Sequence, residues 1–247
     1  STDWRLIVAA GAAANLAVNL AMGDPVLRSA ALTAANVLEV AICIRLLRIE
    51  RRPFNITVAR DLIRFILVAG LIAPAMSSLA AATAISGDAP FADTFLLWFA
   101  ADSLGLLIFT PAILAVASAD TVLWRKERRP ELLAVLLALT ICSVLVFGQS
   151  SYPLLFVIPP LLTLATFRLG IAGAGVGLIV VTFCAIAFAV AGQGPTQLAD
   201  ASQIGRVLLL QAFLALMSIT TLPIAAALAD GKRSAQKLDA ARTEAER

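Results

Sequence analysis

Residues 171–191 read IAGAGVGLIVVTFCAIAFAVA and contain no charged side chain. A helix of this length rises about 30 Å, which matches the hydrocarbon thickness of a bilayer. The bias extends along the chain, because 60% of its 247 residues are apolar and only 14% are charged. Soluble domains carry about 25% charged residues. The stretch therefore predicts a membrane-spanning helix in a chain whose main solvent is lipid.

Further apolar stretches lie on both sides of this one, separated by short polar connections. They predict an all-α fold, a polytopic integral membrane bundle of about eight transmembrane helices. The two weakest are the first, which is rich in Ala and holds two Asn, and the sixth, which is short and contains Pro159-Pro160. The expected spans are 5–22, 26–47, 60–85, 92–118, 131–148, 152–168, 171–191 and 204–228.

Lys and Arg are distributed over the connections in a way that predicts the topology. When the eight expected spans are threaded through a membrane, all 19 basic residues except Arg28 and Arg206 fall on one side. Loops on the cytoplasmic side of membranes carry the excess of Lys and Arg. We therefore expect both termini in the cytoplasm, with residues 1–228 forming one membrane-embedded domain.

Residues 229–247, ADGKRSAQKLDAARTEAER, are polar and contain no Pro, so they are expected to be helical. One interpretation is a solvated charged tail. The other is a cytoplasmic signalling helix that leaves the membrane toward an output domain, and the absence of a helix stop favours a chain that continues. A seam of small or apolar residues at heptad spacing runs along this helix and also favours a homodimer through it. Its small or apolar positions are Leu228, Gly231, Ala235, Leu238 and Ala245, with Arg242 at one seam position.

Several kinds of chemistry are excluded by missing residue types. The chain has no His, so a His-ligated metal and acid–base catalysis by His are excluded within it. Cys43, Cys142 and Cys184 stand singly in apolar runs, which gives neither a disulfide framework nor a metal motif. We expect no catalytic residue, metal or cofactor. Because the basic residues flank apolar spans, membrane topology explains them and nucleic acid is not an expected partner.

Polar side chains within the spans are costly and mark candidate sites. Glu39 lies three residues after Asn36, on what is expected to be the same helix face, and Asp102 lies four residues after Trp98. Each has two interpretations, either hydrogen bonding between helices or work on a ligand or proton. An ion pair of Arg206 with Asp102 or Glu39 is also expected. The full candidate set is Asn36, Glu39, Trp98, Asp102, Arg206 and Gln211.

Small residues and prolines mark expected helix contacts and bends. Gly173 and Gly177 have GxxxG spacing and follow Gly170. In a membrane this spacing predicts close helix packing rather than a phosphate-binding loop. Gly105 and Pro111 lie in the span 92–118, where Pro111 removes a backbone hydrogen bond and is expected to bend the helix.

Four segments resemble motifs of the bacterial membrane-associated sensor domains of the first MASE class. WFAADSLGLLIFTPAILA (98–115) resembles the family's W-x-x-x-D-x-L-G-x-L-x-x-x-P pattern, and ANVLEVAICIRLLR (35–48) resembles its N-x-x-E segment. TFRLGIAGAG (166–175) is similar to its F-R-x-G run, and RVLLLQAFL (206–214) to its R-x-x-x-x-Q-x-F-L segment. The matching positions are Asn36, Glu39, Trp98, Asp102, Gly105, Pro111, Arg168, Gly170, Arg206 and Gln211.

The resemblance implies a sensory input domain of the bacterial inner membrane that detects an unknown small ligand or membrane signal. Such domains usually precede a diguanylate cyclase, a phosphodiesterase or a histidine kinase, which implies cyclic-di-GMP or two-component signalling. Family members usually begin with further apolar segments carrying a W-P-P-x-G-like motif. This sequence has no such motif, so we expect either a missing start or a shortened member.

Two other functions remain open from the same residues. A secondary transporter or channel-like protein would use Glu39 and Asp102 as coupling groups. A structural subunit in contact with other membrane subunits would use them only as buried hydrogen-bonding groups. An output domain after residue 247 favours the sensor.

Overall fold

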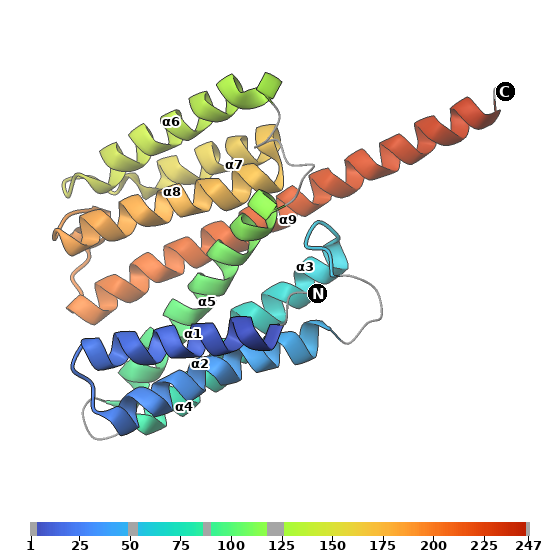
Figure 1. Cartoon of the computed structure of the whole chain (residues 1–247). Helices are drawn as coiled ribbons and strands as arrows, with labels where there is room; N and C mark the ends of the chain where they lie inside the picture. The colour runs from blue at the N-terminus through green and yellow to red at the C-terminus, as the bar shows by residue number, and fades with distance from the viewer. Residues whose placement is uncertain (1–3, 49–53, 86–89, 118–125, 246–247) are drawn as a thin grey trace. The chain divides into compact units, whose positions relative to one another are not determined.

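The computed structural model describes residues 4–48, 54–85, 90–117 and 126–245, and the regular elements among them are helices, with no strand. The predicted all-α fold is confirmed. Figure 1 shows the order of the helices along the chain. They are α1 (Trp4–Ala21), α2 (Val26–Leu47), α3 (Ala59–Leu67), α4 (Ala73–Ala84), α5 (Phe91–Ala117), α6 (Arg129–Phe147), α7 (Ile158–Leu169), α8 (Ile171–Val190) and α9 (Gln203–Ala245).

Among the described residues, six helical stretches are long and apolar enough to cross a membrane, which confirms a polytopic bundle. The two spans that the sequence marks as weakest fall short of this length, at Arg5–Ala21 and Leu154–Leu169. The sidedness of the loops stays a prediction, and its basic residues Arg51, Arg52 and Arg125 lie outside the described residues. The six stretches are Val26–Leu47, Ala59–Ala84, Phe91–Ala117, Arg129–Phe147, Ile171–Val190 and Gln203–Glu244.

Proline explains why the sixth span is short. The segment begins as a 3-10 turn over Leu154–Val157, and α7 starts only at Ile158. Pro159 and Pro160 therefore occupy the first turn of α7. The first backbone N–H groups of a helix have no partner within it, so proline is tolerated there.

The helices form two compact units, and each has a buried core of its own. The first unit comprises Ser1–Phe54 and Arg64–Ser103, and the second comprises Asn55–Ile63 and Leu104–Arg247. Both α3 and α5 contribute residues to each unit. The candidates Asn36, Glu39, Trp98 and Asp102 thus belong to the first unit, and Arg206 and Gln211 to the second.

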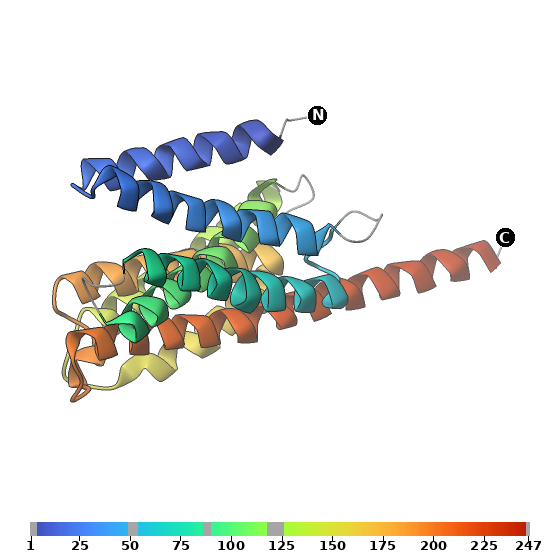
Figure 2. The ribbon, with the colours of Figure 1, turned by 90° about the horizontal axis from the view of Figure 1, so that it is seen from below.

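In the first unit α2 packs against α4 and α1. Figure 2 shows α1 and α2 as neighbouring helices of opposite direction. On α2, Leu32 and Ala35 pack against Ala81 and Ile85, with Trp98 beside this small core. Small side chains at such a contact let two helices approach closely in a membrane. The buried face of α2 has residues three or four apart: Ser29, Leu32, Ala35 and Glu39.

A π-helical turn precedes Pro74 in the first unit. The turn covers Val68–Ile72 and ends two residues before Pro74. In a regular α-helix the ring of Pro74 would clash with the carbonyl of Gly70. The wider π turn relieves this clash. Ala59–Ala84 therefore remains one apolar stretch long enough to span a membrane.

In the second unit, α8 packs against α6, α7 and α9. Close approach depends on glycines of α8. A Cβ added at Gly173 would lie 2.0 Å from the Ala165 carbonyl oxygen, and one at Gly175 would lie 2.8 Å from the Ala112 Cα. The turn from α7 into α8 requires Gly170, whose φ of +63° is unfavourable for other residues. The largest fully buried core side chains include Leu139, Ile158, Leu162, Leu178 and Val181.

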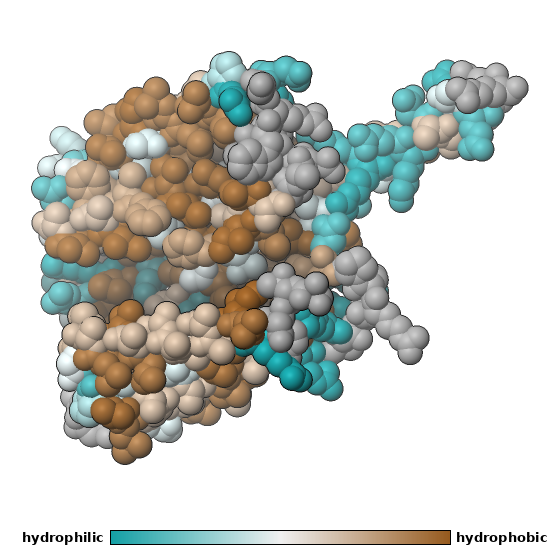
Figure 3. Space-filling model, viewed as in Figure 1, coloured by the Kyte–Doolittle hydropathy of each residue, from teal (hydrophilic) through white to brown (hydrophobic). Residues whose placement is uncertain are grey.

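Helix α9 is much longer than a membrane span. Its 43 residues run from Gln203 to Ala245, and Pro223 lies inside the helix. At 1.5 Å per residue this gives about 65 Å, roughly twice the hydrocarbon thickness. Its buried residues end at Ala226, whereas Leu238 is 73% exposed. Figure 1 shows the C-terminal part extending beyond α6, α7 and α8, and Figure 3 shows that part as hydrophilic.

The outer side of α6, in contrast to the hydrophilic end of α9, is an apolar surface. Leu133, Leu137 and Leu145 are each more than 60% exposed. Figure 3 shows this region of the second unit as a largely hydrophobic surface. An apolar surface of this extent on a soluble domain marks an interaction site, whereas on a membrane bundle it contacts acyl chains.

We predict that Gly175→Ala destabilises the protein while Gly105→Ala does not. The added Cβ at Gly175 meets the backbone of Ala112, whereas at Gly105 it meets no atom within 4 Å. Overpacking of this kind costs about 1–3 kcal/mol. The measurement is thermal unfolding of both variants in detergent. Equal melting temperatures for the two would show that α8 does not need glycine at this contact.

Candidate functional site

A buried acidic cluster lies in the first unit. Glu39 on α2 is 7% exposed and Ser77 on α4 is fully buried. The Ser77 hydroxyl donates a hydrogen bond to the Asp102 carboxylate of α5 at 3.1 Å. Asp102 is close enough to Glu39 for the two charges to interact. Three helices therefore bring two acidic side chains and a hydroxyl together.

Within the described residues of the first unit, neither carboxylate of this cluster has a basic partner. One oxygen of Glu39, Oε1, is buried and makes no hydrogen bond. Charged groups at membrane depth are costly unless they are paired. Such an arrangement can hold a proton or a cation between the two carboxylates, or accept hydrogen bonds from a ligand.

Trp98 borders the same cluster from α5. Its ring packs beside the core formed by Leu32 and Ala81. The indole N–H is buried beside Asp102 but does not reach hydrogen-bond geometry. The cluster thus offers one free donor and one free acceptor, the second being Glu39.

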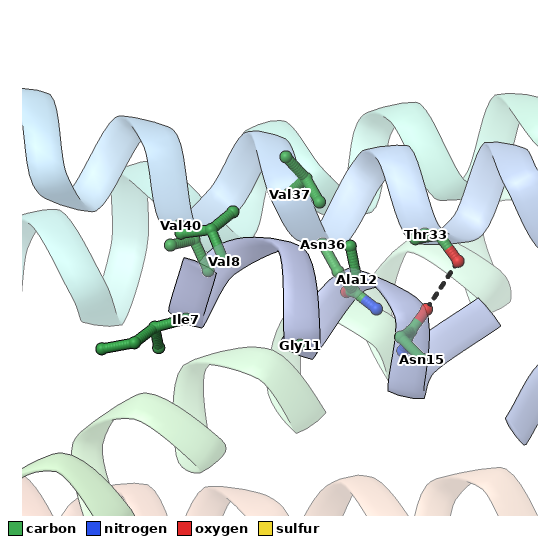
Figure 4. A pocket seen from close by; sticks show the side chains of 9 residues that line it. All are labelled: Ile7, Val8, Gly11, Ala12, Asn15, Thr33, Asn36, Val37 and Val40. Carbon is green, nitrogen blue, oxygen red and sulfur yellow. Dashed lines mark hydrogen bonds between the residues drawn. The ribbon is translucent and has the colours of Figure 1, made fainter. Parts of the chain in front are cut away.

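Asn36 faces a different neighbouring helix from the one that Glu39 faces. It lines a cavity of about 330 Å³ between α1 and α2, with Asn15 and Thr33 at one end. Figure 4 shows Asn36 beside Ala12 of α1, and Asn15 accepting a hydrogen bond from Thr33. Residues three apart on a helix are about 60° apart around its axis. That rotation is enough to place Asn36 on the α1 side of α2 and Glu39 on the α4 side.

In the second unit, Arg206 lies beside a cavity of about 300 Å³. Its Nη1 donates a hydrogen bond to Gln197 Oε1 at 2.7 Å, and its Nε is buried without a partner. Gln211, five residues later, does not line this cavity, although its amide oxygen is also buried without a partner. Arg206 therefore has a neutral partner within its own unit. Its predicted pairing with Asp102 or Glu39 stays a prediction.

The remaining positions of the resemblance lie in the second unit. Arg168, at the end of α7, pairs with Glu131 at 2.5 Å, and Arg128 pairs with the same carboxylate at 2.8 Å. Helix α5 continues through Pro111 to Ala117. Gly177 faces Leu162, whose Cδ1 would lie 2.7 Å from an added Cβ. The described residues contain no group of three or more metal-ligating side chains.

Sequence reasoning missed Ser77 and Gln197, the hydrogen-bond partners of Asp102 and Arg206. Ser77 stands in an apolar run beside Ser78, so nothing in the sequence separates the two. In the structure Ser78 bonds to the Pro74 carbonyl of its own helix, whereas Ser77 bonds to another helix. Gln197 lies in a connecting segment without any periodic pattern.

We predict that Ser77→Ala and Asp102→Ala, which remove the donor and the acceptor of this bond, are coupled in stability. Interhelical hydrogen bonds in membranes average about 0.6 kcal/mol and reach about 1.7. A double-mutant cycle on thermal unfolding in detergent should give a coupling in this range. Ser78→Ala is the matched control, because its equally buried hydroxyl stays within α4. The same coupling with Ser78→Ala, or none with Ser77→Ala, would contradict the assigned bond.

A comparison with protein families matches the MASE1 model over residues 1–230. Neither the curated proteins nor the solved structures contain a match to this chain. The matched range covers every helix of both units up to the polar end of α9. MASE1 domains are membrane-associated sensory domains, which agrees with the apolar, polytopic fold. The chain belongs to the MASE1 family of membrane-embedded sensory input domains.

Proposed function

We propose that this domain senses a signal in the bacterial inner membrane and passes it through α9 to a cytoplasmic output domain. The output expected from the family resemblance is a diguanylate cyclase, a phosphodiesterase or a histidine kinase. The observation that supports this most is the continuity of α9 from the bundle core into a polar, exposed helix. A helix of this kind transmits a shift or rotation at one end to the other.

The buried half of α9 packs in the core of the second unit, as a helix that transmits a movement of the bundle has to do. Leu214 and Met217 pack in the core of the second unit. The Ser218 and Thr221 hydroxyls donate hydrogen bonds to carbonyls of their own helix. The face of α9 that packs against α7 and α8 is therefore apolar. A change in the packing of α7 or α8 would therefore move α9 as a rigid body.

A polar contact holds α9 where its exposed part begins. The Arg233 guanidinium donates a hydrogen bond to the Thr57 hydroxyl, and both residues belong to the second unit. Thr57 also donates to Asn55 Oδ1, while the Asn55 N–H bonds to Asp61. The turn before α3 thus presents the Thr57 oxygen to α9. This contact is a candidate for a bistable element that a signal changes.

The exposed part of α9 favours a second copy of the chain as its partner. Leu238 is 73% exposed, and Gly231 and Ala235 lie on the same seam. A seam of small and apolar residues at heptad spacing pairs helices in coiled coils. Dimerisation there would link the movement of α9 to an output domain that works as a dimer.

Insertions after Ser234 test this function in the full-length protein, because they leave the Arg233–Thr57 contact in place. One added Ala rotates everything downstream by about 100°, whereas seven restore the heptad phase. We expect one residue to change the output activity several-fold in membrane vesicles, and seven to leave it near wild type. Output activity that ignores every insertion would contradict transmission through α9.

Loss of the Thr57 hydroxyl should shift the output without unfolding the domain. Removing one hydrogen bond is worth about 0.5–1.5 kcal/mol, a roughly two- to tenfold shift of a two-state equilibrium. The measurement is basal output activity of Thr57→Ala in vesicles. Thr243→Ala serves as the control, because its hydroxyl bonds only to Asp239 within α9. Equal effects of both variants would remove the Arg233 contact from the mechanism.

A transporter is the second candidate, favoured by the two acidic side chains near Ser77. Coupled transport uses such intramembrane carboxylates to carry protons or ions. Proton-coupled flux in vesicles that is lost in Asp102→Asn would support this function over a sensor that only binds its signal.

A further inference from the structure

The loop between α8 and α9 is folded into a defined structure. Gly192 and Gly194 have φ of +73° and +110°, which favour glycine at both positions. The Gly194 N–H donates to the Ser150 hydroxyl at 3.1 Å, which ties the loop to the α6–α7 connection. A short 3-10 turn over Pro195–Leu198 then presents Gln197 to Arg206. The loop therefore forms one wall of a preorganised cavity.

This cavity combines a polar end with apolar walls. Its volume is about 300 Å³, at the lower end of the range for sites that bind small molecules. Thr196, Gln197, Gln203 and Arg206 form the polar part. Val190, Val207 and Leu210 form the apolar part. A nucleotide or a peptide is too large for this space, whereas a small organic acid matches its size and polarity.

Within the described residues of its own unit, Arg206 forms no ion pair with a carboxylate. Its Nη1 bonds only to the neutral amide of Gln197, and its buried Nε has no partner. A guanidinium presents donors in a rigid fork that suits carboxylate and phosphate oxygens. By comparison Arg28 pairs with Asp24 at 3.3 Å.

The position of Arg206 near the start of α9 makes its unpaired positive charge still less favourable. It is the fourth residue of a 43-residue helix. The first turn of a helix carries a partial positive charge, so a cation there is unfavourable by itself. An anion near Arg206 and Gln203 would be attracted by both the guanidinium and the helix end.

We propose that this cavity binds a small carboxylate, or the oxyanion of a lipid headgroup, through Arg206. The oxyanion accepts from the Arg206 guanidinium, while Gln197 holds the guanidinium in place. The short apolar part of the ligand packs against Val190 and Val207. This deepens the proposed function by naming the chemical class of its signal, and it rests on that function only for its biological meaning.

Thermal unfolding in nanodiscs tests the site without any output domain. The probe is isobutyrate in discs of neutral phosphatidylcholine, with isobutyramide as the uncharged molecule of the same shape. A second arm replaces part of the lipid by phosphatidylglycerol. We expect isobutyrate or phosphatidylglycerol, but not isobutyramide, to raise the melting temperature. In Arg206→Gln the concentration needed should rise about tenfold or more.

Arg28→Gln is the matched control, because it removes the same charge from an arginine that already has a carboxylate partner. It should keep the wild-type response. Arg206→Lys, which keeps the charge without the planar fork, should respond more weakly than wild type, and its unliganded melting temperature shows that the variant folds. An Arg206-dependent response to isobutyrate indicates a free carboxylate, and one to phosphatidylglycerol alone indicates a lipid.

Two results would overturn the site. One is an equal response in Arg206→Gln and wild type, and the other is no response of wild type in either arm. Neither result affects the α9 insertions, which are read from output activity.

Discussion

Lipid offers polar groups no hydrogen-bond partner, so a polar group of this chain is satisfied only where another group of the chain reaches it. Several hydroxyls of the apolar helices bond within their own helix, four residues back, as Thr140 does to Leu136 and Thr166 to Leu162. These bonds satisfy the hydroxyl, but they do not connect one helix to another. The few bonds that leave a helix are therefore the ones that specify tertiary structure. They include Ser77 to Asp102, Thr33 to Asn15 and Arg206 to Gln197.

The two units meet this constraint in different ways. In the first unit, the buried stripe of α2 carries a carboxylate among small and apolar residues, and Glu39 keeps one oxygen without a partner. In the second unit, glycines of α8 bring backbones together, and the polar groups gather at the ends. Arg206 at the start of α9 and Arg233 near its exposed part thus lie on one continuous helix. A ligand at the first and a change at the second would be linked through that helix.

The sequence predicted the helices because apolar length and loop charge are local properties. The stretch 26–47 coincides with α2, and 171–191 differs from α8 by one residue. It also singled out Glu39, Asp102 and Arg206, since charged residues stand out in apolar runs. The partners of these residues were not predictable, because a buried Ser77 or a loop Gln197 differs from its neighbours only in what it contacts in three dimensions.

The division of α2 between two neighbours shows the same limit. Spacing alone placed Asn36 and Glu39 on one face, and only the positions of α1 and α4 separate them. Helix length is a similar case. The sequence showed no stop in residues 229–247, but it left open whether this segment was a solvated tail or a continuation of the last span. In the structure it continues that span as far as Ala245; residues 246–247 lie outside the described residues.

Signalling through α9 depends on the continuity of this helix, and a distance measurement tests that continuity most directly. Spin labels at the exposed positions Ile219 and Ala240 would flank the point where the bundle ends. In a background with Cys43, Cys142 and Cys184 replaced by Ala, pulsed electron paramagnetic resonance in nanodiscs reads their separation. A rigid helix predicts a narrow distribution near the backbone rise of about 32 Å. A broad distribution would mean that α9 ends at the bundle and carries no movement beyond it.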